Sequence, residues 1–193
     1  MGRKTSPLRK TMKTLEIRRH SIRFQPGDHL NQTGVTLARS VGQNLGPFDL
    51  VVTSTLPRAF ETAIAMGFAV DEQIELMSTY GNDVGREAPW PLSLAGYAEA
   101  VRGAGAAATY ANRLVQVYGK LIHYLADGRA ALVINHGGIL ELGAVAALPD
   151  ADHFAWGSHF DYCEGIRLFW EEGKFVDSEV LRVSGKSTGR LVC

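Results

Sequence analysis

The sequence predicts an α/β fold: a three-layer α/β/α sandwich with a mostly parallel central sheet and a C-terminal hairpin. Short apolar runs that are typical of buried strands alternate with segments of helical period along the chain. The last part instead carries two alternating runs on either side of Glu172-Gly173, which is the pattern of a hairpin. With 46% hydrophobic and 21% charged residues, the 193-residue chain has the composition of a folded protein with a buried core.

The elements of the first half are justified by the period of their apolar residues and by the residues that end them. Leu15 and Ile17 alternate with polar residues, so a strand is expected up to Arg19. The helix that follows ends at Gly46-Pro47, because proline does not continue a helix, whereas Pro57 is tolerated in the first turn of the next one. The expected elements in chain order are a strand at 14–19, a helix at 35–45, a strand at 50–52, a helix at 57–66 and a strand at 74–77.

The second half is expected to resume this alternation after an exposed loop or lid at residues 80–93. Leucine and valine recur at helical spacing from 114 to 125, which predicts a helix. The apolar run 130–134 indicates a buried strand, and His136-Gly137-Gly138 then turns the chain into another helix. The hairpin is expected within residues 165–183.

Residues 1–13 are expected to form a flexible basic leader, and residues 14–193 a single domain. The 20 basic residues balance 20 acidic ones, so no nucleic-acid or membrane partner is indicated by overall charge. No apolar stretch approaches the roughly 18 residues of a membrane span. The two cysteines form no disulfide framework and no metal cluster, so a cytoplasmic location is expected.

Three polar segments are predicted to follow directly on the carboxyl ends of strands. They are Arg19-His20, residues 53–58 with Arg58, and residues 135–138 with His136. Ligands of α/β sheets bind in the crevice outside these strand ends. If the strands are neighbours, two arginines and two histidines converge there and need an anion, for which phosphate fits best. The amides of Gly137-Gly138 at a helix start would add hydrogen-bond donors toward the same anion.

These motifs resemble the histidine phosphatase superfamily, also called phosphoglycerate-mutase-like. Arg19-His20-Ser21 is similar to its Arg-His-Gly hallmark, and residues 53–63 and 133–138 resemble two later motifs in the right order. The resemblance spans about residues 14–145. It implies a metal-independent phosphatase, without a cofactor, that hydrolyses a phosphomonoester or a phosphoprotein through a phosphohistidine.

The resemblance also implies residue roles. His20 is expected to attack phosphorus as a neutral imidazole whose other ring nitrogen is held by a backbone carbonyl. Arg19, Arg58 and His136 are expected to hold the phosphate oxygens. Arg23 is a candidate for a further phosphate or substrate contact.

The proton donor or acceptor and the turn after His20 are less well matched to the family. Asp83 is the first candidate for the acid, and Glu87 is the second. Ser21 stands where the family has glycine. If the turn needs a positive φ there, serine is strained; if it does not, the serine hydroxyl is free to contact phosphate.

Three alternatives stay open at this point. One is a catalytically weak phosphate-binding or protein-interaction module on the same fold. Another is phosphoryl transfer of the phosphoglycerate-mutase type. The third is a metal-dependent hydrolase that uses His136, His153 and Asp161.

Overall fold

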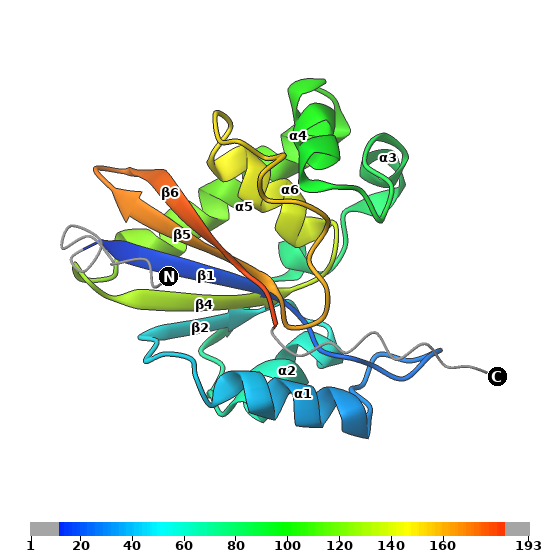
Figure 1. Cartoon of the computed structure of the whole chain (residues 1–193), viewed down its shortest axis with the longest axis vertical. Helices are drawn as coiled ribbons and strands as arrows, with labels where there is room; N and C mark the ends of the chain where they lie inside the picture. The colour runs from blue at the N-terminus through cyan, green and yellow to red at the C-terminus, as the bar shows by residue number, and fades with distance from the viewer. Residues whose placement is uncertain (1–11, 184–193) are drawn as a thin grey trace.

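A six-stranded mixed sheet forms the centre of the computed structural model, which describes residues 12–183 (Figure 1). The strand order is β3-β2-β4-β1-β5-β6. The first four strands of that order run parallel to one another, and the last two form the antiparallel hairpin that the sequence predicts. The strands are β1 (Lys13–Arg19), β2 (Leu50–Thr53), β3 (Glu72–Gln73), β4 (Ala130–Asn135), β5 (Gly165–Glu171) and β6 (Lys174–Leu181).

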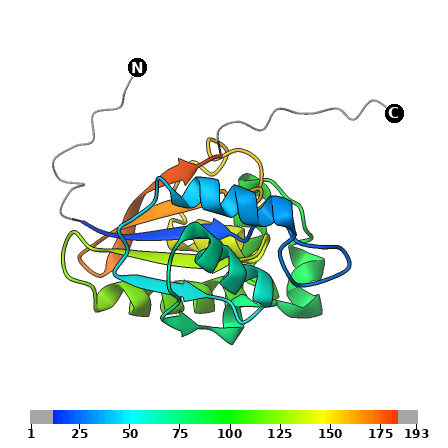
Figure 2. The same cartoon turned by 90° about the horizontal axis from the view of Figure 1, so that it is seen from below.

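Helices cover both faces of this sheet, which confirms the expected three layers (Figures 1 and 2). Side chains alternate along β4: Ala131 and Val133 join the core on one face, and Leu132 and Ile134 the core on the other. The second face carries α1 (Gln32–Gly42) and α2 (Pro57–Met66); the first carries α3 (Gly81–Glu87), α4 (Leu94–Arg102), α5 (Ala106–His123) and α6 (Ile139–Ala147).

The start of the chain differs slightly from the expectation. β1 begins at Lys13, one residue before the predicted boundary, because Lys13 already pairs with Trp170 of β5. The predicted leader otherwise falls on residues 1–11, outside the described part of the chain.

Two predictions for residues 74–93 are wrong. The strand expected at 74–77 is a short 3-10 helix at Glu75–Met77, and the pairing strand is β3, just before it. The apolar residues at 74–77 nevertheless pack in the core, where Met77 is fully buried. The loop expected at 80–93 contains α3, whose polar sequence hides its helical period apart from the buried Val84.

The carboxyl ends of β1, β2 and β4 meet at one edge of the sheet. Arg19 lies opposite Asn135, and Thr53 lies opposite Ile134. The amide of His20 donates to the carbonyl of Asn135 at 2.9 Å. Because all three strands are parallel neighbours, the three polar segments that follow them are brought together, as the sequence predicts.

Helix α1 reaches this edge through a close backbone approach at Gly34. A Cβ at Gly34 would lie 1.9 Å from the carbonyl oxygen of Ile22.

We expect Gly34→Ala to lower the free energy of unfolding by about 1–3 kcal/mol or more, because the two backbones must separate. The matched control is Gly96→Ala in α4, where the nearest atoms lie at 3.4 Å. That change should be neutral or stabilising by up to about 1 kcal/mol. Urea unfolding of both variants tests this, and equal effects would contradict it.

Candidate active site

His20 lies at the carboxyl end of β1 and is buried. Its Nδ1 lies 2.7 Å from the carbonyl oxygen of Ser21. A carbonyl only accepts hydrogen bonds, so Nδ1 carries the proton and Nε2 keeps its lone pair. Burial, and then the charges of Arg58 and Arg19, lower the pKa of His20 to about 3 against the opposing effect of the Ser21 hydrogen bond. The imidazole is therefore neutral at physiological pH, and a backbone carbonyl fixes its proton as expected.

His136 faces His20, with 5.0 Å between the ring centroids. Its Nδ1 accepts a hydrogen bond from Nε of Arg58 at 3.2 Å, so its proton is on Nε2, which lies 2.6 Å from the hydroxyl oxygen of Ser54. Burial first, and then the neighbouring His20, Arg58 and Arg19, lower the pKa of His136 to about 2. Both imidazoles are thus held neutral. Ser54 is a site residue that the sequence indicates only as part of the polar segment 53–58.

Arg58 connects His136 to the loop that precedes α1. Its Nη1 forms an ion pair with Asp28, while its Nε is bonded to His136. Arg23 comes from the same loop and is bonded to the carbonyls of Phe24 and Gly27. The charge of Arg23 contributes to the lowered pKa values of both histidines, so Arg23 lies near the cluster, and its contact with phosphate or substrate stays a prediction. Asp28 is not predicted, because a single acid in a polar loop carries no sequence signal.

Two aromatic rings enclose the guanidinium group of Arg19. Its Cζ lies 4.7 Å from the ring centroid of Trp90 and 4.3 Å from that of Tyr162. Its Nη1 donates to the carbonyl of Phe160 at 3.2 Å and lies 3.8 Å from Asp161. Cation–π contact of this kind holds a guanidinium in place and leaves its edge open to an anion.

The turn after His136 is shaped by its two glycines. A Cβ at Gly137 would lie 2.4 Å from the ring of Trp90, so only glycine lets this indole reach the site. Gly138 has φ 84°, and its amide donates to Glu141 at 2.7 Å. The expectation that both amides point at an anion is therefore corrected for Gly138, whose donor is bonded within the helix start.

Glu141 joins this turn to the segment that carries Tyr162. The carboxylate is fully buried and also accepts from the amide of Phe160 at 2.9 Å. Burial raises the pKa of Glu141 to about 7 against those hydrogen bonds. Glu141 therefore holds two segments that flank Arg19, the turn after His136 and the segment from Phe160 to Tyr162, from the buried side.

Ser21 is a structural residue in this turn. Its hydroxyl donates to the carbonyl of Gly34 at 2.7 Å, and its amide donates to the Thr62 hydroxyl at 2.9 Å. The positive-φ residues other than glycine in the described chain are Ala104, Cys163 and Glu172, so Ser21 is unstrained. The expectation that its hydroxyl contacts phosphate is thus corrected.

The structure places both predicted acids on α3, with Glu87 as its last residue. Asp83 is an exposed side chain that pairs with Arg86. Glu87 accepts from the amides of Ala106 and Ala107 and so caps the start of α5, and these hydrogen bonds lower its pKa. Neither acid is bonded to His20 or His136, and the roles of Asp83 and Glu87 stay predictions.

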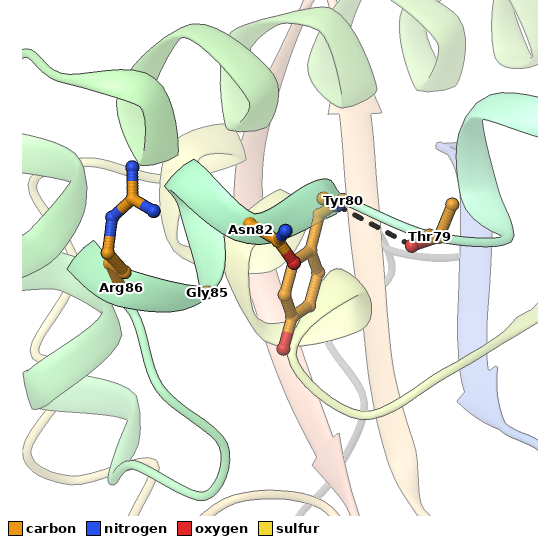
Figure 3. Close-up of a pocket in the computed structure, with 6 residues that line it drawn as sticks. Thr79, Tyr80, Asn82, Gly85 and Arg86 are labelled. Carbon is orange, nitrogen blue, oxygen red and sulfur yellow. Dashed lines mark hydrogen bonds between the residues drawn. The ribbon is translucent and has the colours of Figure 1, made fainter.

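A pocket of about 480 Å³ lies at the start of α3 (Figure 3). It is lined by Thr79, Tyr80, Asn82 and Arg86, among others. The ring of Tyr80 lies against Gly138, where a Cβ would come within 2.7 Å of it. The pocket is therefore next to the turn that carries His136 and offers mainly polar side chains.

The described residues do not support the metal-site alternative. His153 is bonded to the carbonyl of Leu148 and packs on Trp156, and the Asp161 carboxylate accepts from the amide of Tyr162. Between residues 12 and 183 no three histidine, cysteine, aspartate or glutamate side chains are grouped to hold a metal ion. Over the same residues, no helix is long and apolar enough to cross a bilayer.

Known proteins match this chain by structure. No protein-family model matches the sequence, and no curated protein does. A phosphoserine phosphatase from Entamoeba histolytica aligns with a TM-score of 0.65 and 17% identity, over 90% of this chain and 98% of that one. A mycobacterial glucosyl-3-phosphoglycerate phosphatase gives 0.62 and 20%, over 89% and 99%. An alpha-ribazole phosphatase from Shigella flexneri gives 0.61 and 17%, over 88% and 96%. The chain therefore has the fold of the histidine phosphatases, as the sequence motifs imply.

The neutral histidines make stability depend on pH. The pKa of His136 is lowered on folding from its usual 6.5, so below that pH the unfolded chain binds a proton that the folded protein does not. The contribution of His136 to the free energy of unfolding is therefore fully present above about pH 6.5 and is lost as the pH falls toward the lowered pKa. We expect His136→Gln to make this loss shallower by about 1.4 kcal/mol per pH unit. Urea unfolding at about pH 7, 5.5 and 4.5 measures it, with His123→Gln on the surface of α5 as the control; an unchanged slope would contradict it.

Proposed function

We propose that this chain is a metal-independent phosphatase that hydrolyses a phosphorylated small molecule through a phosphohistidine on His20. The observation that carries the proposal is the neutral imidazole of His20, whose Nδ1 proton is bonded to Ser21 and whose Nε2 lone pair is available beside two guanidinium groups. The shared fold with the phosphatases named above supports it.

In the first step, Nε2 of His20 attacks phosphorus, and the bond from phosphorus to the leaving oxygen breaks. The leaving oxygen takes the bonding electron pair and a proton. Arg19 and Arg58 hold the remaining phosphate oxygens, and their charge stabilises the transition state. The aromatic rings around Arg19 keep its guanidinium in the orientation that this contact needs.

In the second step, a water molecule attacks the phosphohistidine and gives up a proton. The bond from phosphorus to Nε2 breaks, and inorganic phosphate leaves. His136 lies against His20, and an anion between the two rings favours its protonated form. Once Nε of Arg58 has exchanged Nδ1 of His136 for a phosphate oxygen, a proton on that nitrogen lets His136 donate to the phosphoryl group while Nε2 stays bonded to Ser54.

The site supports a small substrate more than a phosphoprotein. The similar structures are named for phosphoserine, glucosyl-3-phosphoglycerate and alpha-ribazole phosphatases. The polar pocket beside Tyr80 offers room for the part of a small substrate that leaves with its oxygen. We propose the cytoplasm as the compartment, since the two cysteines of the sequence are too few for the disulfide framework of a small secreted domain.

The weak phosphate-binding module is less well supported. Its main argument in the sequence is the serine in place of glycine after His20. Ser21 is unstrained and its hydroxyl is bonded to Gly34, so this replacement leaves the nucleophile in position.

Replacement of the nucleophile gives the first test. We expect His20→Ala to lower hydrolysis of 4-nitrophenyl phosphate by about 10³-fold or more, because the covalent route is lost. His123→Ala, on the exposed face of α5, should keep wild-type activity. Brief incubation of the wild type with labelled substrate should trap an acid-labile phosphoenzyme that the His20 variant lacks. Phosphate release by His20→Ala at the wild-type rate would refute the mechanism.

Chelation gives the second test. We expect the rate with 4-nitrophenyl phosphate to be unchanged after dialysis against EDTA, because arginine and histidine side chains supply the charge that a metal would supply. Loss of activity that added zinc or magnesium restores would favour the metal-dependent alternative.

A further inference from the structure

We propose that Asp28 is the carboxylate that transfers the proton to the leaving group and takes one from the attacking water. This inference rests on the proposed function and deepens it. It is carried by the ion pair between Asp28 and Arg58, together with the exposure of Asp28 at the mouth of the site.

Arg58 places Asp28 next to the phosphate position. One nitrogen of the guanidinium is bonded to His136, at the bottom of the site, and another is bonded to Asp28. The side chain of Arg58 is 15% exposed, whereas that of Asp28 is 56% exposed. A phosphate group that binds Arg58 therefore has the Asp28 carboxylate beside it, on the solvent side.

The geometry of the reaction puts the leaving oxygen on that same side. The attacking and leaving atoms lie roughly in line with phosphorus between them. His20 is 5% exposed and attacks from the buried side. The leaving oxygen in the first step, and the water that replaces it in the second, consequently lie on the outer side, where Asp28 is.

The loop that carries Asp28 is fastened to the same helix as Arg58. Glu61, one turn after Arg58 in α2, accepts from the amide of Leu30 at 2.7 Å and pairs with His29 at 2.5 Å. On the other side of Asp28, Arg23 donates to the carbonyl of Gly27. These contacts hold the carboxylate at the site rather than leaving its position to a free loop.

Other carboxylates fit this role less well. Glu141 is fully buried and is bonded to two amides behind the site. Asp161 lies 3.8 Å from Arg19, and an oxygen of its carboxylate accepts from the amide of Tyr162. Asp83 pairs with Arg86 on α3.

The proton transfers balance over one turnover. In the first step the protonated Asp28 gives its proton to the leaving oxygen as the bond to phosphorus breaks, and becomes a carboxylate. In the second step the carboxylate takes a proton from water as the oxygen of that water bonds to phosphorus and the bond to Nε2 of His20 breaks. The proton that Asp28 takes from water in one turnover is the proton that it gives to the leaving oxygen in the next.

The test compares two substrates of similar size whose leaving groups differ in acidity. 4-Nitrophenolate leaves without protonation, whereas phenolate needs a proton more strongly. We expect Asp28→Asn to lower kcat/KM for phenyl phosphate by about 10²-fold or more, and for 4-nitrophenyl phosphate by less than about 10-fold. The parameter kcat/KM reports the phosphorylation step, so slow hydrolysis of the phosphoenzyme does not obscure the comparison.

Two control variants carry the same change elsewhere. Asp83→Asn and Asp161→Asn should lower kcat/KM for the two substrates by equal factors, if at all. Inorganic phosphate should inhibit Asp28→Asn at least as strongly as it inhibits the wild type, because the variant no longer has a carboxylate that competes for Arg58. This inhibition shows that the pocket is intact.

Three results would overturn the inference. Equal losses with both substrates would mean that Asp28 only orients Arg58. No loss with either substrate would remove any role in the reaction. A loss that depends on the leaving group in Asp83→Asn or Asp161→Asn, but not in Asp28→Asn, would assign the role to that residue. The proposed function fails separately, if the wild type is inactive or His20→Ala keeps its activity.

Discussion

The structure depends on a concentration of positive charge at one buried edge of the sheet. Arg58 is bonded to His136, and the charges of Arg19, Arg58 and Arg23 reach both imidazoles, which burial keeps neutral. Protonated histidines there would repel the guanidinium groups, so the site is stable without ligand only while both rings stay neutral. The same constraint makes the site selective for an anion, which is the one type of ligand that relieves it.

Arg19 and Arg58 have different partners for their guanidinium groups, and this difference affects what an incoming anion must displace. Arg19 is held by ring faces and a carbonyl, so little has to be displaced when an anion arrives. Arg58 already holds a carboxylate, so a phosphate group must compete with Asp28 for it. Behind both, the buried Glu141 ties the turn after His136 to the segment of Tyr162 by two backbone hydrogen bonds. The buried part of the site is thus fixed by hydrogen bonds, whereas the ion pair between Arg58 and Asp28 on the solvent side can be exchanged for another anion.

The sequence predicts the parts of this site that follow from parallel strands and misses those that follow from packing. Apolar periodicity locates β1, β2 and β4, and parallel neighbours bring their ends together, so His20, Arg58 and His136 could be predicted. Asp28 could not, because a single acid in a polar loop carries no sequence signal, and the contact of Trp90 with Arg19 depends on packing that the sequence does not specify. Ser21 differs from the glycine of the family that the motifs resemble, and its hydrogen bond to Gly34 could not be predicted because it depends on how α1 packs.

Trp90 lies in contact with Arg19, so its fluorescence depends on the surroundings of that guanidinium group. This indole lies on Gly137 and over the guanidinium of Arg19, whereas Trp156 packs on His153 and Trp170 on Phe175. An anion that arrives at Arg19 changes the electric field across one of these three fluorophores and leaves the surroundings of the other two as they were. If phosphate binds Arg19 as proposed, the emission of Trp90 reports that binding without a dye, a label or a coloured substrate.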